Sequence, residues 1–290
     1  MTRRAVNRSS LPDLMIRDAV RAALAEDLGR AGDITTNLIV APDAALTGIV
    51  SAREEGRIAG IDLAAAAFRE VDGGVDIRVE KEDGDDVVAG DSVLVIAGNA
   101  RGVLTAERTA LNLLGHLSGV ATATRSLVEA VHGTHAQICC TRKTTPGLRA
   151  FEKYAVRMGG GMNHRFGLDD AVLIKDNHLA VAGGITPAVS AARAGIGHMV
   201  KIEVEVDTLE ELDEALAAGV EIVLLDNMAP DLLSNAVERK AGRAVLEASG
   251  GITLESVRAV AETGVDLISV GWITHSAPCL DLGLDHSARV

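Results

Sequence analysis

The chain has 290 residues, of which 48% are hydrophobic, and its formal net charge is −13 at pH 7. This length is sufficient for about two domains with buried cores. A strongly acidic chain with only 2% aromatic residues is poorly suited to binding nucleic acid, because such surfaces need a basic face and usually stacking rings.

The N-terminal residues and the cysteines indicate the cellular setting. The first ten residues, MTRRAVNRSS, lack the apolar stretch of a secretory signal, and no apolar run approaches the roughly 18 residues of a membrane span. We therefore expect a cytoplasmic protein without a membrane partner. Three cysteines, two of them adjacent at Cys139 and Cys140, do not form a disulfide framework, and we interpret them as small buried apolar residues rather than redox groups.

The first hundred residues combine a helix with short strands. Apolar residues recur at helical spacing from Leu11 to Leu28, and Gly29 and Gly32 end the predicted helix. Between Leu46 and Asn99 short β-rich pieces alternate with Gly and Asp turns, which predicts a sandwich of strands. The stretch GDDVVAGDSVLVIAG resembles a lipoyl-type sandwich, but it presents no lysine in a tight hairpin, so a scaffold is the favoured interpretation.

The remainder of the chain alternates apolar strands with amphipathic helices, which is typical of a parallel sheet or an α/β barrel. A long helix is predicted from Glu107 to His132. The predicted strands are Gln137 to Thr141, Ala171 to Lys175, Val200 to Glu205, Glu221 to Asp226, Ala244 to Ala248 and Asp266 to Val270. The predicted helices between the later strands are Leu209 to Ala218, Asp231 to Ala241 and Leu254 to Thr263.

Every predicted strand delivers a polar or glycine-rich group at its carboxyl end. These groups are Arg142 with Lys143, Lys175, Glu205, Asp226, Ser249 to Gly251, and Gly271. In α/β barrels the carboxyl ends form the mouth, where loops converge on the ligand. The segments SGGI and SVGW resemble a phosphate site built from backbone N–H groups, although each alone also fits an ordinary turn.

Positive charge is concentrated between Thr141 and His178. This stretch holds seven Lys and Arg and four Asp and Glu, a local net charge of +3 in a chain of −13. Because like charges repel, such a cluster is costly without an anionic partner. The Debye length is roughly 8 Å at physiological salt, so a local basic pocket can bind a small carboxylate or phosphate ester despite the acidic surroundings.

Several motifs are similar to those of one enzyme family. They are EDLGRAGDITT, RTALNLLGHLSGVATAT, TRKTTPGLR, RMGGGMNHRFGLDDAVLIKDNH, IEVEV, LLDNM, SGGI and SVGWITHS. In this order, and over nearly the whole chain, they resemble quinolinate phosphoribosyltransferase.

The resemblance implies an α/β fold with an N-terminal α/β sandwich domain and an incomplete, open α/β barrel domain of the TIM type. We place the sandwich at residues 1–115 and the barrel at residues 116–275, with the tail 276–290 packing back on the sandwich. It further implies a homodimer that uses Mg²⁺. The implied reaction converts quinolinate and phosphoribosyl pyrophosphate to nicotinate mononucleotide, pyrophosphate and CO2 in de novo NAD biosynthesis.

The resemblance also implies roles for individual residues. The quinolinate carboxylates would be held by Arg142, His164, Arg165 and Lys175, with Arg108 supplied by the partner subunit. Lys143 would face phosphoribosyl pyrophosphate, and Glu205 and Asp226 would hold the ribose hydroxyls and Mg²⁺. The remaining expected substrate contacts are Thr141, Ser249, Gly250, Gly251, Val270, Gly271, Trp272 and His275. The expected catalytic residues are Lys143, Lys175, Glu205 and Asp226.

These residue types suit that chemistry. Arginine binds carboxylates bidentately, and lysine supplies a point charge. Pyrophosphate leaves the ribose through an oxocarbenium-like state, which nearby carboxylates stabilise, while a metal ion stabilises the departing anion. The ribosylated ring nitrogen is cationic and acts as an electron sink for loss of the adjacent carboxylate. We therefore expect no nucleophilic residue and no Schiff base.

Several alternatives remain open from the sequence. Glu203 lies on the same strand face as Glu205 and could be the acidic ligand instead. Lys175 could form an imine in an aldolase. The chain could also be a non-catalytic metabolite-binding or assembly subunit, or a transferase of the same fold that acts on another base.

Other polar residues have simpler interpretations. We expect His178 and His198 to be structural hydrogen-bonding groups, and His116 to line either the core or the pocket. Lys153 and Arg157 lie four apart on a predicted helix, which indicates a solvated face or a subunit contact.

Overall fold

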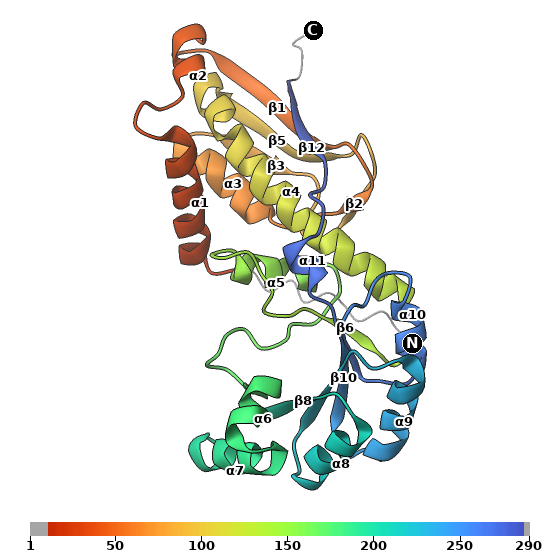
Figure 1. Cartoon of the computed structure of the whole chain (residues 1–290). Helices are drawn as coiled ribbons and strands as arrows, with labels where there is room; N and C mark the ends of the chain where they lie inside the picture. Colours follow the sequence, from red (N-terminus) through yellow and green to blue (C-terminus); the bar gives the residue numbers. More distant parts are fainter. Residues whose placement is uncertain (1–10, 287–290) are drawn as a thin grey trace. The chain divides into compact units, whose positions relative to one another are not determined.

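The computed structural model describes residues 11–286, which form two compact units (Figure 1). The first unit comprises residues 11–123, 151–160 and 276–286, and the second comprises residues 124–150 and 161–275. The expected division between residues 115 and 116 falls inside helix α4 (Ala100–Ala130), and the chain changes unit at residues 123/124 of that helix. Residues 1–10 and 287–290, parts of the expected sandwich domain and tail, lie outside the described residues.

The first unit is an α/β sandwich. Its antiparallel sheet has the order β12 (Leu282–His286), β1 (Ala45–Ala52), β5 (Ser92–Asn99), β3 (Asp76–Val79). A separate antiparallel pair joins β2 (Gly56–Arg57) to β4 (Asp86–Val87). The helices are α1 (Asp13–Leu28), α2 (Ile34–Ile39), α3 (Ile61–Val71), most of α4, and most of α5 (Arg149–Met158).

Local sequence explains the first and third helices. Helix α1 matches the predicted helix and buries Ile16, Val20 and Leu24, which recur every fourth residue on one face. Helix α3 was not predicted, because the segment IDLAAAAFREV lies inside the stretch interpreted as strands only. Its four alanines favour a helix, and its buried residues form an apolar face, so the strands-only prediction was wrong for this segment.

Two glycines in α4 allow the C-terminal segment to lie against the helix backbone. A Cβ on Gly119 would stand 2.0 Å from the Pro278 carbonyl oxygen, and one on Gly115 would stand 3.0 Å from the Leu280 carbonyl oxygen. The Leu280 N–H donates to the Gly115 carbonyl at 2.9 Å. Residues four apart share a helix face, so Gly115 and Gly119 together leave a strip of helix backbone uncovered. The C-terminal segment can approach this strip only because glycine has no side chain.

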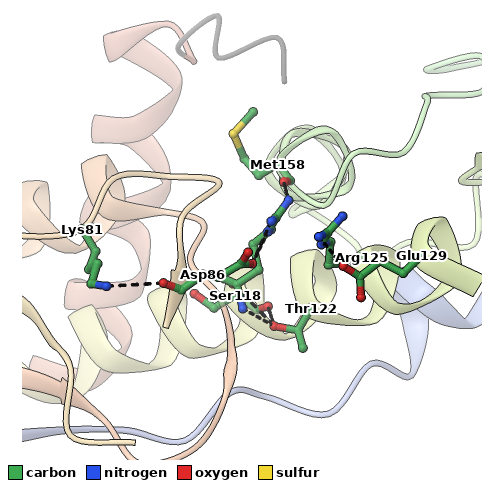
Figure 2. Close-up of polar contacts among 8 residues, drawn as sticks. Lys81, Asp86, Ser118, Thr122, Arg125, Glu129 and Met158 are labelled. Atoms are coloured by element: carbon green, nitrogen blue, oxygen red, sulfur yellow. Dashed lines mark hydrogen bonds and ion pairs between the residues drawn. The ribbon is translucent and has the colours of Figure 1, made fainter. Parts of the chain in front are cut away.

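The buried Arg57 joins three elements of the first unit, and Figure 2 shows its partners. Its guanidinium pairs with Asp86 at 2.7 Å and donates to the Met158 carbonyl, at the end of α5, at 3.3 Å. Its backbone N–H donates to Thr122 Oγ1, on α4, at 2.8 Å. Because the last carbonyls of a helix have no partner within the helix, the guanidinium stabilises the end of α5.

The second unit is an open α/β barrel, as expected. Its all-parallel sheet has the order β6 (Gln137–Cys139), β11 (Leu267–Ser269), β10 (Val245–Ser249), β9 (Ile222–Asp226), β8 (Ile202–Val206), β7 (Val172–Ile174). Its helices are α6 (Asp176–Ala182), α7 (Ile185–Gly195), α8 (Leu209–Ala217), α9 (Pro230–Lys240), α10 (Val257–Glu262) and α11 (Trp272–His275). Within the described residues β6 and β7 do not pair, so the sheet does not close.

The strand register places the acidic residues of the second unit on one face of the sheet. Glu205 on β8 and Glu247 on β10 are both opposite the same residue of β9, and Asp226 is opposite Ser249. Directly opposed residues of a parallel sheet point to the same face, and every second residue returns to it. Glu203, two residues before Glu205, therefore lies on the same face as Glu205, Asp226, Glu247 and Ser249.

Candidate active site

The residues expected at the barrel mouth lie at the carboxyl ends of six strands of the second unit. The segment 141–143 follows β6, Lys175 follows β7, and Gly271 follows β11. Glu205 is the fourth of the five residues of β8, and Asp226 and Ser249 end β9 and β10. Since carboxyl ends of parallel strands lie along one edge of the sheet, the register brings these groups together.

Lys175 and Glu205 form an ion pair between Nζ and Oε2. The Lys175 side chain is 45% exposed, whereas that of Glu205 is 13% exposed, so the amine reaches in from solvent toward a mostly covered carboxylate. The Lys175 backbone N–H donates to Nδ1 of His178 at 2.9 Å, at the start of α6. The structural role predicted for His178 is confirmed.

Asn227 connects the ends of β9 and β10, a role that the sequence did not indicate. Its side-chain amide donates to Asp226 Oδ2 at 2.6 Å, and its backbone N–H donates to the Ser249 carbonyl at 2.9 Å. A Cβ on Gly250, which has a φ of +100°, would stand 2.1 Å from Asn227 Oδ1. Both the backbone conformation and this close approach require glycine at position 250.

Gly271, which follows β11, lies next to three polar side chains, those of Lys143, His275 and Thr141. A Cβ on Gly271 would stand 2.9 Å from Lys143 Cδ and 3.5 Å from both His275 Nε2 and Thr141 Oγ1. Trp272 Nε1 donates to a carbonyl in the loop after β10, that of Ile252, at 3.1 Å. The missing side chain at position 271 therefore leaves room beside a lysine, a histidine and a hydroxyl group.

Two guanidinium groups, those of Arg142 and Arg165, stand close enough to affect one another. Burial lowers the pKa of Arg165, and the charge of Arg142 lowers this pKa further. Arg165 Nη1 donates to the Ala171 carbonyl at 3.0 Å. The Nε atoms of both arginines are buried and have no hydrogen-bond partner among the described residues. Two charged donors without acceptors are suited to binding an anion.

His164, which precedes Arg165, contacts two buried glutamates. Its Nε2 lies 3.0 Å from Glu203 Oε2 and 3.6 Å from Glu247 Oε1, and the two glutamates are 4% and 2% exposed. Burial, together with the charge of Glu203, raises the pKa of Glu247 to about 7. The three residues bring metal-type ligand atoms within 4.8 Å of one another. Glu203, the alternative acidic ligand, thus faces His164.

Asp207 is a further acidic residue that the sequence interpretation missed. Burial raises its pKa, and the charges of Glu211, Asp226 and Asp176 raise it further. Asp207 follows Glu205 by two positions, so the alternating acidic pattern of EVEVD could have identified it.

Two of the expected or considered site residues belong to the first unit. Arg108 is an exposed residue of α4. His116 is half-buried on the same helix, and its Nε2 lies 2.9 Å from Glu152 Oε1 on α5.

The structure corrects two smaller predictions. Lys153 is only 1% exposed, so the prediction of a solvated face was wrong for this residue. The Arg157 guanidinium lies over the Tyr154 ring, 5.4 Å from the ring centroid. Cys139 and Cys140 are buried as expected, but Cys279 is exposed. His198 is exposed.

No helix in residues 11–286 is long and apolar enough to cross a membrane.

Comparisons with known proteins identify the family. The family profiles "Quinolinate phosphoribosyl transferase, N-terminal domain" and "C-terminal domain" match residues 33–118 and 120–285. The chain belongs to the quinolinate phosphoribosyltransferase family. Its relative in Mycobacterium leprae, nicotinate-nucleotide pyrophosphorylase (carboxylating), is 49% identical over 274 residues, covering 93% of this chain and 96% of that protein. The probable enzyme of the same name in Bacillus subtilis is 44% identical and covers 94% of this chain and 93% of that protein.

The solved structure of the nicotinate-nucleotide pyrophosphorylase from Francisella tularensis has the same family fold. It superposes on the chain with a TM-score of 0.92 at 42% identity, covering 96% of this chain and 98% of that one. The sandwich and open barrel described above are therefore the arrangement found in this family of transferases.

Proposed function

We propose that the chain transfers the phosphoribosyl group of phosphoribosyl pyrophosphate to quinolinate with decarboxylation, giving nicotinate mononucleotide, pyrophosphate and CO2 in NAD biosynthesis. The observation that carries the proposal is that one sheet edge bears both unpartnered guanidinium donors and the carboxylates Glu205 and Asp226. The donors suit a dicarboxylate, and the carboxylates suit a ribose with a developing positive charge. Family membership supports the same reaction.

Quinolinate would bind at Arg142, His164, Arg165 and Lys175. Leaving a buried donor without a partner costs about 1–3 kcal/mol, and more when the group is charged. The two buried Nε donors therefore favour a ligand that carries two carboxylates, and such a ligand also offsets the repulsion between the guanidiniums. Lys175 would add a point charge at the edge of the same pocket.

The sugar phosphate would bind on the other side of the mouth. Lys143 and His275 beside Gly271 suit the negative charge of phosphoribosyl pyrophosphate, and Thr141 offers a hydroxyl group. The backbone of residues 249–251 and 270–272 would hold the 5′-phosphate, which requires close approach of main-chain N–H groups.

Glu205 and Asp226 would hold Mg²⁺ and the ribose hydroxyls. Their carboxylates are the hard oxygen ligands that Mg²⁺ prefers, and they lie on adjacent strands on the same face of the sheet. The bound ion would supply charge stabilisation for the departing pyrophosphate. The His164 cluster is a poorer cation site, because the guanidinium of Arg165 interacts with Glu203 and opposes a second positive charge there.

We further propose a homodimer in which Arg108 reaches the partner's pocket. Arg108 is an exposed cation on α4, the long helix of the first unit, so a second copy can meet it. The residues of the second unit would then supply the remainder of each site.

The reaction can be tested directly. Purified protein incubated with quinolinate, phosphoribosyl pyrophosphate and Mg²⁺ should yield nicotinate mononucleotide, detected by mass spectrometry. Absence of the product at micromolar enzyme would refute the proposal. Competition with other pyridine carboxylates would distinguish a transferase for another base, and borohydride trapping of a carbonyl compound on Lys175 would instead indicate an aldolase.

The shared site can be tested by complementation. Arg108→Ala and Lys143→Ala should each be inactive but folded, and mixed dimers of the two should regain part of the activity, because one of the two sites is then intact. Arg69→Ala, which removes another exposed arginine of the first unit, is the matched control and should remain active. No recovery in mixtures shown to contain heterodimers would contradict a contribution across the dimer.

A further inference from the structure

A histidine of the proposed quinolinate pocket, His164, forms a cluster with two buried glutamates, Glu203 and Glu247. Glu203 on β8 and Glu247 on β10 point to the same face, and both contact or approach His164 Nε2. Oε1 of each glutamate is buried without a hydrogen-bond partner among the described residues. Two carboxylates with unused acceptors in a barrel core are destabilising on their own, so an offsetting role is expected.

The contacts of His164 define which nitrogen carries its proton. Nδ1 accepts the backbone N–H of Arg165 at 2.7 Å, so Nδ1 is unprotonated. Nε2 lies 3.0 Å from Glu203 Oε2, an acceptor, so this geometry favours the tautomer with the ring hydrogen on Nε2, facing Glu203. The imidazole is therefore held at both nitrogens, by the carboxylate on one side and by the main chain of the next residue on the other.

The same carboxylate also acts on the neighbouring guanidinium. Burial and the charge of Arg142 disfavour the charged form of Arg165, and the charge of Glu203 opposes both effects. The backbone of Arg165 is fixed through His164, and its side chain is anchored by the Ala171 carbonyl at 3.0 Å. Glu203 is thus linked to Arg165 twice, once through the histidine ring and once through charge.

We propose that Glu203 is a positioning residue of the acceptor pocket, which orients His164 and holds the Arg165 guanidinium in place without touching the substrate itself. The proposal rests on the proposed function for the identity of the acceptor, quinolinate. Glu203 is the second residue of β8, two positions before Glu205, so it lies farther from the carboxyl end of the strand than the proposed ribose and metal ligand. Its effect should fall on binding of the dicarboxylate.

Three variants separate this role from simple structural support. Glu203→Leu removes both the acceptor and the charge, and should raise the KM for quinolinate about tenfold or more, while the KM for phosphoribosyl pyrophosphate changes less than about twofold. Glu203→Gln keeps an acceptor for His164 but loses the charge, and should raise the KM for quinolinate by less. Glu247→Gln is the matched control, because Glu247 is as deeply buried but lies farther from His164 Nε2, and should have the smallest effect.

A second measurement does not depend on activity. Nitrogen-15 NMR of the imidazoles, assigned with His164→Gln, should show the Nε2–H form of His164 in the free protein and in Glu203→Gln, but a changed tautomer population in Glu203→Leu. This distinguishes failure of the positioning role from failure of the proposed function, because inactivity toward quinolinate would leave the NMR result intact.

Three results would overturn the proposal. One is a Nδ1–H form of His164 in the unaltered protein. Another is an unchanged KM for quinolinate in folded Glu203→Leu or, if that variant does not fold, in Glu203→Gln. The third is an equal increase in both KM values, or an effect of Glu247→Gln as large as that of Glu203→Gln, since either would indicate general support of the barrel.

Discussion

Replacing Gly119 by alanine should destabilise the protein, although alanine is the better helix former. In a solvent-exposed helix interior this substitution gains about 1 kcal/mol. Here the new Cβ would stand 2.0 Å from the Pro278 carbonyl oxygen. The neighbouring atoms belong to the backbone of Pro278 and Cys279, so no side chain can rotate to relieve the clash. The C-terminal segment would have to move by about 1 Å, and overpacking of this kind costs about 1–3 kcal/mol or more.

We expect a net loss of about 2 kcal/mol in the free energy of unfolding, equivalent to about 4–8 °C in Tm for a chain of this size. The assay is thermal unfolding followed by circular dichroism. Gly195→Ala, at the end of α7, is the matched control because nothing lies within 4 Å of its Cβ, and it should leave Tm unchanged or higher. A Gly119→Ala protein as stable as the unaltered chain would refute the reasoning from close packing.

Three further outcomes follow from the site. Burial and the charge of Glu203 raise the folded-state pKa of Glu247 to about 7, so the free energy of unfolding falls as the pH rises from about 4.5 to 7. In urea titrations over that interval, Glu247→Gln should gain up to about 3 kcal/mol relative to the unaltered protein. A difference between the two proteins that stays constant with pH would contradict this. Gly250→Ala should raise the KM for phosphoribosyl pyrophosphate at least about tenfold, since positive φ and Asn227 exclude a side chain; an unchanged KM would count against a phosphate role for this turn. Removing divalent ions with EDTA should abolish turnover and adding Mg²⁺ should restore it, and full activity in EDTA would exclude the metal role of Glu205 and Asp226.

The barrel could be predicted well because each of its strands is a short apolar run that ends in a charged or glycine-rich group. Strand β10 is shifted by one residue at each end relative to the prediction, whereas β9 begins one residue later than predicted and ends at the predicted Asp226. The first unit was harder, because α3 is alanine-rich and short, and because β12 owes its place to pairing with β1, more than two hundred residues earlier. Local periodicity carries no information about such distant partners.

The site could be predicted in part for the same reason. Lys175 and Asp226 stand out as charges directly after apolar runs, which is a local signal. Glu247 was missed because its significance lies in the register of β10 against β9, which aligns it with Glu205. The burial of Lys153 also depends on tertiary packing, and helical spacing alone suggested the opposite.

Helix α5 has a consequence for the modularity of the chain. The polypeptide leaves the barrel unit after residue 150 and re-enters it at residue 161, and in between it is anchored to the sandwich through Tyr154, whose hydroxyl donates to Asp83 at 2.6 Å, and through Arg57. Arg142 precedes this excursion and His164 follows it. A gene fragment encoding residues 124–275 would therefore carry α5 between the two anion-binding segments but would lack Asp83 and Arg57, the sandwich residues that anchor this helix.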